Sequence, residues 1–123
     1  MRRMWIGVGV LLALLAVGLL VMQLTDRRLG EVSETLQQAS ETENWDEAVS
    51  LAQQAQTNWK KQWHLMAALA DHSELDTIDG LFAQLEVYRQ RSAKTYHAAT
   101  CARLSEAIRD LEENNRFTWW NLL

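Results

Sequence analysis

The N-terminal end of the chain is one long apolar run. From Trp5 to Leu24 the only polar side chain is that of Gln23. A helix rises about 1.5 Å per residue, so about 20 residues match the hydrocarbon core of a bilayer, which is about 30 Å thick. The run therefore predicts a transmembrane anchor over residues 1–24.

A cleaved secretory signal is the alternative interpretation, because Arg2 and Arg3 supply the basic start that signal peptides share. A signal peptide usually has a shorter apolar region, of about 7 to 15 residues, that ends at a small-residue cleavage site. The candidate site at residues 16–18 lies inside the apolar run, which continues beyond it. The pattern favours an anchor that is kept.

The positive charges on either side of the run predict its orientation. Arg2 and Arg3 oppose Arg27 and Arg28, and beyond Arg28 no further Lys or Arg appears until Lys60. Positive charge favours the cytoplasmic side, and the segment before the run is very short. We therefore expect a single pass through the cytoplasmic membrane, with a cytoplasmic N-terminus and residues 25–123 outside the cytoplasm.

Apolar residues continue at helical spacing after the anchor. Leu29, Val32, Leu36 and Ala39 are separated by three or four residues, which predicts a helix over residues 25–42 that prolongs the anchor. Gly30 is a weak point in that helix and a possible hinge, because Gly costs about 1 kcal/mol relative to Ala inside a helix.

Two further helices are predicted by the same periodicity. Asn44 is suited to cap a helix over residues 45–71, followed by acidic residues in its first turn. Its apolar stripe comprises Trp45, Ala48, Ala52, Ala55, Trp59, Trp63, Met66 and Ala70. Ser73, with Asp76 three positions later, nearly matches a capping box and predicts a third helix over residues 74–115. That helix carries Leu75, Ile78, Phe82, Leu85 and Tyr88, then Cys101, Leu104, Ile108 and Leu111. An apolar tail over residues 116–123 must pack on another surface.

Composition supports an all-α fold. Proline is absent, and Gly30 and Gly80 are the only glycines after the anchor. Since these residue types are the strongest markers of turns, the predicted architecture is a transmembrane helix that continues into an antiparallel bundle of about three long helices. Residues 25–123 suffice for one domain.

The net charge of the domain limits the kinds of molecule that it can bind. Residues 25–123 contain 10 Lys or Arg and 16 Asp or Glu, a formal net charge of −6. An acidic domain lacks the basic surface that nucleic acid requires. Anionic lipid headgroups are disfavoured as well, except at Arg27 and Arg28. A single cysteine, Cys101, excludes an internal disulfide, and its place on the apolar stripe indicates a core residue.

His72, Glu74 and Asp76 are the candidate metal ligands, because imidazole and carboxylate groups bind metals. The same residues are also what a helix junction needs, with a cation at the end of one helix and acids at the start of the next. We favour the structural role, and the predicted break at Ser73 separates His72 from Asp76. Lys60 and Lys61 beside Trp59 and Trp63 form either a basic and aromatic binding face or a solvated face. No catalytic or cofactor-binding residue is predicted.

The spacing of several residues resembles a bacterial family catalogued as domain of unknown function 4363. The residues that carry the resemblance are Trp45, Ala48, Trp59, Lys60, the junction that contains His72, Glu74 and Asp76, then Tyr88 and the terminal Asn121-Leu122-Leu123. The family ending is more usually Asn-Ile-Leu, so Leu122 is a departure. The resemblance spans the whole chain and implies an anchored helical protein of anaerobic Gram-positive bacteria. It implies no activity.

The sequence thus predicts a protein that is not an enzyme and that uses no cofactor. Its helical domain is expected to serve as an interaction or scaffolding module at the outer face of the cytoplasmic membrane, through a protein partner or self-association. A metal sensor or enzyme at His72, Glu74 and Asp76 is one alternative. The other is a module that contacts the bilayer through Trp63, Trp119 and Trp120.

Overall fold

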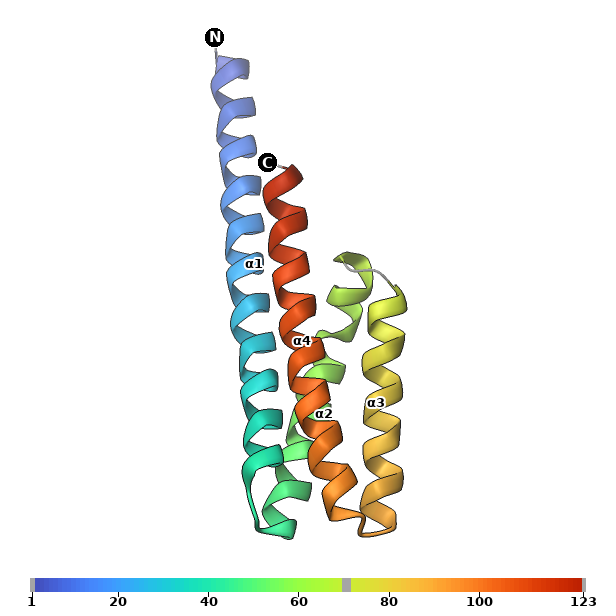
Figure 1. Ribbon diagram of the computed structural model, residues 1–123. Coiled ribbons are helices and arrows are strands. Elements are labelled where there is room, and N and C mark those ends of the chain that lie inside the picture. The colour runs from blue at the N-terminus through green and yellow to red at the C-terminus, as the bar shows by residue number, and fades with distance from the viewer. Residues whose placement is uncertain (1, 70–71, 123) are drawn as a thin grey trace.

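The computed structural model describes residues 2–69 and 72–122, with side chains at residues 2–21, 23–24, 27–68 and 72–114. Over the described residues the chain forms four α-helices, α1 (Arg2–Glu41), α2 (Trp45–Leu69), α3 (His72–Gln90) and α4 (Lys94–Leu122). Successive helices run antiparallel in a bundle, and the N-terminal part of α1 and the C-terminal part of α4 extend beyond α2 and α3 (Figure 1). The predicted all-α class is confirmed.

The first helix, α1, joins the apolar run to the bundle without a break. Residues 2–21 have a mean hydropathy of 2.6 and are not buried by any other part of the protein, so this segment is long and apolar enough to cross a membrane. The same helix then buries Leu29, Val32, Leu36 and Ala39 in the core. The predicted continuation of the apolar helix into the bundle is confirmed.

Gly30 does not interrupt α1. Its backbone is helical, and a Cβ atom built there meets nothing within 4 Å. Gly30→Ala should therefore raise the free energy of unfolding by about 0.5–1 kcal/mol, because Ala loses less conformational entropy in a helix. Thermal unfolding of the full chain in detergent, followed by circular dichroism, measures the gain. Gly80→Ala in α3 is the matched control, since its Cβ also meets nothing. If Gly30→Ala lowered the stability and Gly80→Ala did not, the result would support a hinge at Gly30.

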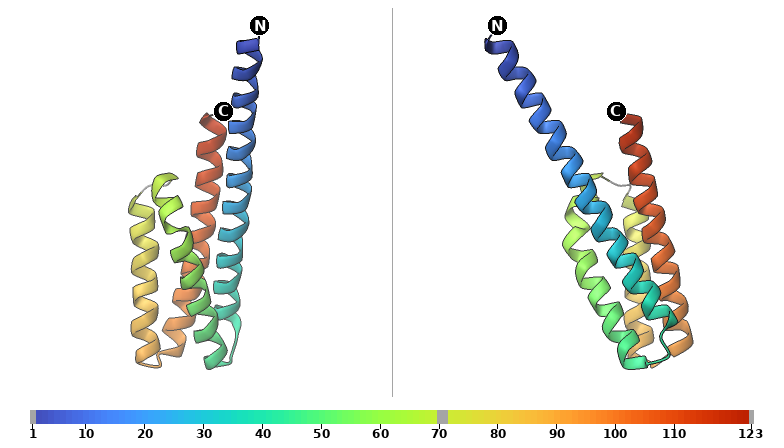
Figure 2. Two further views of the ribbon diagram at one scale, coloured as in Figure 1. Left: turned by 180° about the vertical axis from the view of Figure 1, so that it is seen from behind. Right: turned by 90° about the vertical axis from the view of Figure 1, so that its left-hand side faces the viewer.

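The core is built from the predicted stripes of all four helices, including Trp59, Leu75, Cys101 and Leu104. The first helix packs most extensively against α4 and α2, whereas α2 and α3 contact each other much less. Figure 2 shows α1 and α2 side by side from two directions. A looser α2–α3 interface leaves room for a surface hollow between these helices.

Polar contacts hold α1 and α4 in register. The Ser105 hydroxyl donates to the Ser33 carbonyl at 2.9 Å, and the two hydroxyl oxygens are 3.1 Å apart, with both side chains buried. Arg109 reaches the same place, where its Nε donates to Ser33 Oγ at 3.1 Å and a terminal nitrogen donates to Gln37. Because these bonds pair particular turns, they oppose sliding of one helix along the other.

The predicted single helix over residues 74–115 is wrong. The chain reverses between α3 and α4, where Ser92 adopts a left-handed φ of 52° and Ala93 N donates to the Tyr88 carbonyl at 2.9 Å. A left-handed residue other than Gly costs about 1–2 kcal/mol. The reversal lets Leu104 and Ile108 pack against the same core as the α3 stripe, and each fully buried side chain contributes about 1.5–3 kcal/mol. Burial therefore outweighs the strained turn.

The strain at Ser92 gives a direct prediction. Ser92→Gly should stabilise the protein by about 0.5–1 kcal/mol, because Gly adopts a left-handed φ without a Cβ clash. The denaturant midpoint of the full chain measures this change. Ser92→Ala keeps the clash and should give no gain, and an equal gain in both variants would mean that backbone strain is not the cause.

Helix boundaries elsewhere also differ from the prediction. The predicted helix end near residue 115 and the separate tail over residues 116–123 are wrong, because α4 continues through Asn114 to Leu122. Asn costs a helix less than about 0.7 kcal/mol, and no Gly or Pro follows to stop it. At the other junction, α3 already begins at His72, so the predicted break at Ser73 is wrong. The predicted end of the second helix at Ala70 and Asp71 lies outside the described residues.

Candidate functional site

Two tryptophans of α2 bind one carboxylate of α3. The indole Nε1 of Trp59 donates to Asp79 Oδ1 at 2.9 Å, and the Nε1 of Trp63 donates to Asp79 Oδ2 at 2.9 Å. The tryptophans lie one turn apart on α2, so both side chains reach the same position on α3. Trp59 is only 1% exposed, while Trp63 is half-buried and Asp79 is exposed. One end of this cluster belongs to the core and the other to the surface.

A hollow of about 350 Å³, called here the α2–α3 hollow, opens beside this cluster. Its lining consists of Gln56, Trp59, Lys60, Trp63, Asp79, Phe82 and Ala83. Each oxygen of Asp79 accepts one indole N–H and keeps a lone pair for a further donor. The hollow thus combines aromatic surface, an anionic acceptor and an ammonium group. These groups suit a side chain that has an apolar stem and a hydrogen-bond donor at its tip.

The candidate metal ligands are not brought together. His72, Glu74 and Asp76 all lie in the first turns of α3, where His72 and Asp76 share a face and Glu74 points elsewhere. The Glu74 Oε1 accepts a hydrogen bond from Asn114 Nδ2 of α4 at 2.9 Å. Among the described residues, no group of three His, Cys, Asp or Glu side chains is placed to hold a metal ion. Glu74 instead ties α3 to α4.

The fold divides the candidate basic and aromatic face at Lys60 and Lys61. Lys60 lines the α2–α3 hollow with Trp59 and Trp63, whereas Lys61 lies on the other flank of α2, beside Arg28 of α1. Consecutive residues of a helix point about 100° apart, which accounts for the separation. The two lysines therefore belong to different surfaces.

Two aromatic contacts lie at the opposite end of the bundle. Trp45 meets His97 edge to face at 4.9 Å between ring centroids, and Tyr88 stacks on Tyr96 at 5.6 Å. Ala48 is buried nearby on the same face of α2 as Trp45. These residues of the family pattern are packing residues. The side chains of Trp119, Trp120 and Asn121 lie outside the described part of the chain.

A cysteine and histidine pair lies in the core of α4. Cys101 Sγ is 3.8 Å from His97 Nδ1, and both residues are buried. Burial raises the pKa of the Cys101 thiol to about 12, and burial also lowers the pKa of the His97 imidazole. At neutral pH the thiol is therefore protonated and hardly nucleophilic. His97 and Cys101 are four residues apart and so share one face of a helix, a spacing that could have revealed the pair. The pair is not among the sequence predictions.

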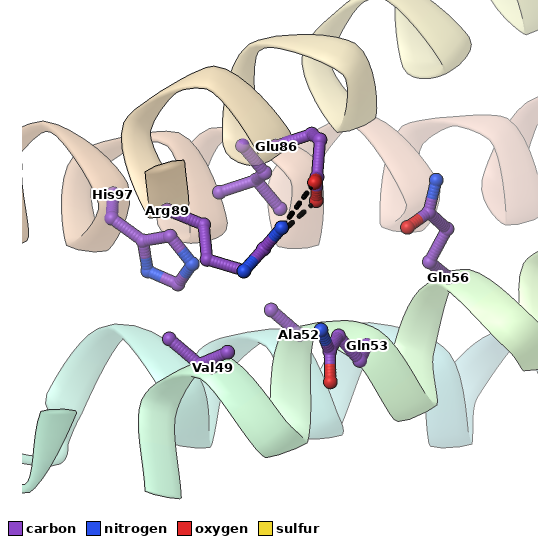
Figure 3. Close-up of a pocket in the computed structure, with 8 residues that line it drawn as sticks. Val49, Ala52, Gln53, Gln56, Glu86, Arg89 and His97 are labelled. Atoms are coloured by element: carbon purple, nitrogen blue, oxygen red, sulfur yellow. Dashed lines mark hydrogen bonds and ion pairs between the residues drawn. The ribbon is translucent and has the colours of Figure 1, made fainter. Parts of the chain in front are cut away.

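A narrow space between α2 and the α3–α4 end of the bundle is shown in Figure 3. It holds only about 10 Å³, with Val49, Ala52, Gln53 and Gln56 on the α2 side and Glu86, Arg89 and His97 opposite. Arg89 Nε donates to Glu86 Oε2 at 3.0 Å, and this ion pair holds the pKa of Glu86 below its usual range. Such a space admits about one water molecule and no larger ligand. Of these two spaces, the hollow at Asp79 is the one large enough to take a side chain.

These features define a class of protein, an all-α bundle whose first helix is long and apolar enough to span a membrane. Residues 21–122 match the model of a family described as Domain of unknown function (DUF4363), and the chain belongs to that family. The match begins near the end of the apolar run and covers the whole bundle. No curated protein and no solved structure matches the chain.

Proposed function

We propose that this protein is a single-pass membrane protein whose bundle serves as an interaction module at the outer face of the cytoplasmic membrane. One observation carries the proposal. The apolar segment and a core helix of the bundle are the same continuous helix, α1. A bundle joined to the membrane in this way has a fixed height above it, which suits a docking function.

The α2–α3 hollow is the proposed docking surface. Its aromatic walls and the Asp79 carboxylate suit a protein partner that inserts a side chain ending in an N–H or O–H donor. Self-association through the same surface is the second form of this proposal. We propose no catalysis and no cofactor.

Membrane insertion and orientation are tested together. Ser50→Cys places a thiol on an exposed position of α2, while the native Cys101 is buried and should stay unlabelled. A membrane-impermeant maleimide should label Ser50→Cys in intact cells, and alkaline washing should leave the protein in the membrane pellet. Labelling only after permeabilisation would mean that residues 25–123 lie in the cytoplasm. A soluble chain whose N-terminus lies near Leu19 would replace the anchor with a cleaved signal.

The docking surface is tested by site-specific photocrosslinking in intact membranes. A photoreactive residue at Ala83, on the rim of the hollow, should form crosslinks to a second protein or a second copy. The matched control is Ala102, which is equally small and exposed but lies on α4. Crosslinks of equal yield at both positions, or none at Ala83, would contradict docking at the hollow.

A further inference from the structure

A second hollow lies between α1 and α2. Its lining consists of Arg28, Glu31, Asn58, Lys61 and Gln62, and its volume is about 230 Å³. Figure 2 shows these two helices side by side along this part of the bundle. The hollow therefore gathers a guanidinium, an ammonium and two amide groups from two helices, all of which can donate hydrogen bonds.

The charges that line this hollow favour an anion. Glu31 is the only carboxylate among the described side chains of this lining, and the Glu31 Oε1 is 4.0 Å from the Arg27 Nε on the same helix. Among the side chains that the structure describes, no ion pair joins Arg28 or Lys61 to a carboxylate. Both cations are exposed and face the same space. An anion with several acceptor oxygens, such as a phosphate group, matches this set of donors.

The position of the hollow along α1 identifies the source of the phosphate. Arg28 follows Leu24, the last residue of the apolar run, by four residues, which is about 6 Å along a helix. A side chain on a helix leans toward the helix N-terminus, so Arg28 leans toward the apolar segment. The headgroup layer on each side of a bilayer is about 5–7 Å thick. With α1 inserted, the guanidinium of Arg28 therefore reaches the level of lipid phosphates.

We propose that the hollow lined by Arg28 and Lys61 binds the phosphate of an anionic phospholipid headgroup. The proposal rests on the membrane insertion of α1 proposed above. The bundle as a whole is acidic, with a net charge of −6 over residues 25–123, so its general surface repels an anionic leaflet. Recognition is confined to a local site that two helices form together. The site ties α2 to the membrane surface as well as to α1.

The test uses the full chain in a maltoside detergent, which contains no phosphate, and measures bound phosphatidylglycerol by native mass spectrometry during a titration. Arg28→Gln with Lys61→Gln should weaken binding by about 25-fold, or about fivefold for each charge removed. Glu31→Gln removes a carboxylate of the lining and should tighten binding severalfold. Diacylglycerol, which lacks the phosphate, should not compete.

Arg91→Gln with Lys94→Gln is the matched control. It removes the same charge from exposed positions at the opposite end of the bundle and should change binding by less than about twofold. Equal weakening in both double variants would overturn the site, because it would show a nonspecific charge effect. Inorganic phosphate that binds as tightly as the lipid would overturn the assignment to a lipid.

Alkaline extraction of the wild-type protein, compared with its lipid preference, separates this proposal from the proposed function. If the wild-type protein resists extraction but shows no preference for phosphatidylglycerol, the lipid site is wrong and the anchored module stands. If the wild-type chain is extracted, the anchor is wrong and the lipid site falls with it. The circular dichroism spectrum of each variant should match that of the wild type, because all the substituted side chains are exposed.

Discussion

Replacing Trp59 with alanine should lower the free energy of unfolding by about 3–5 kcal/mol. The indole of Trp59 is 1% exposed and is the largest fully buried side chain among the described residues, so its removal leaves a large cavity between α2 and α3. A domain of this size has a total stability of about 5–15 kcal/mol, so the variant should be close to unfolding at room temperature. Denaturant unfolding of the full chain in detergent measures the loss.

Trp59→Phe separates packing from hydrogen bonding. Phe retains most of the aromatic volume but has no N–H for the Asp79 carboxylate, so the loss should be about 1.5–3 kcal/mol. Trp63→Ala is the positional control, because Trp63 is only half-buried and its removal opens no enclosed cavity. A loss below about 1 kcal/mol for Trp59→Ala would mean that this indole is exposed in solution.

Replacing Asp79 with alanine should destabilise the protein by about 1.5–3 kcal/mol, although the side chain is exposed. The change removes the acceptor of both indole N–H groups. The N–H of the buried Trp59 would then lose its hydrogen bond to Asp79 while it stays shielded from water. Most exposed substitutions change stability by less than about 0.5 kcal/mol, so the effect would stand out. Equilibrium unfolding monitored by tryptophan fluorescence suits this variant, because both indoles report on the site.

Asp79→Asn is the matched comparison for this residue. Its side-chain oxygen can still accept one indole N–H, but its NH₂ group faces the other, so the loss should be intermediate. Asp76→Ala, one turn earlier on α3 and also exposed, should be nearly neutral. Equal losses for Asp76→Ala and Asp79→Ala would assign the effect to the helix and not to the paired indoles.

Periodicity predicted the course of α1 and α2 closely. Leu29, Val32 and Leu36 repeat at helical spacing and are all buried, because only that face of α1 meets α2 and α4. The turn after α3 had no comparable signal. It contains neither Gly nor Pro, and the stripe merely weakens before Cys101. Tertiary burial of the resumed stripe makes the chain reverse there, and local sequence preferences do not record that free energy.

The candidate site was only partly visible in the sequence. Trp59 and Trp63 were recognised as residues of one helical stripe, which fits the burial of Trp59. Their partner Asp79 lies 20 residues from Trp59 on another helix, and it resembled other acids near the start of α3. Which of those carboxylates faces the indoles depends on how α2 and α3 are packed. A periodic pattern within one helix carries no information on that register.

Because α1 is one unbroken helix, its apolar segment and the bundle would tilt together in a membrane. From Leu24 to Glu41 the helix extends for about 25 Å beyond the apolar run. Transmembrane helices tilt by about 20° on average and tilt further when the bilayer is thin. In a bilayer, a tilt of that size would move the far end of the bundle sideways by about 9 Å. Membrane thickness would then change the direction in which the α2–α3 hollow, the proposed docking surface, faces.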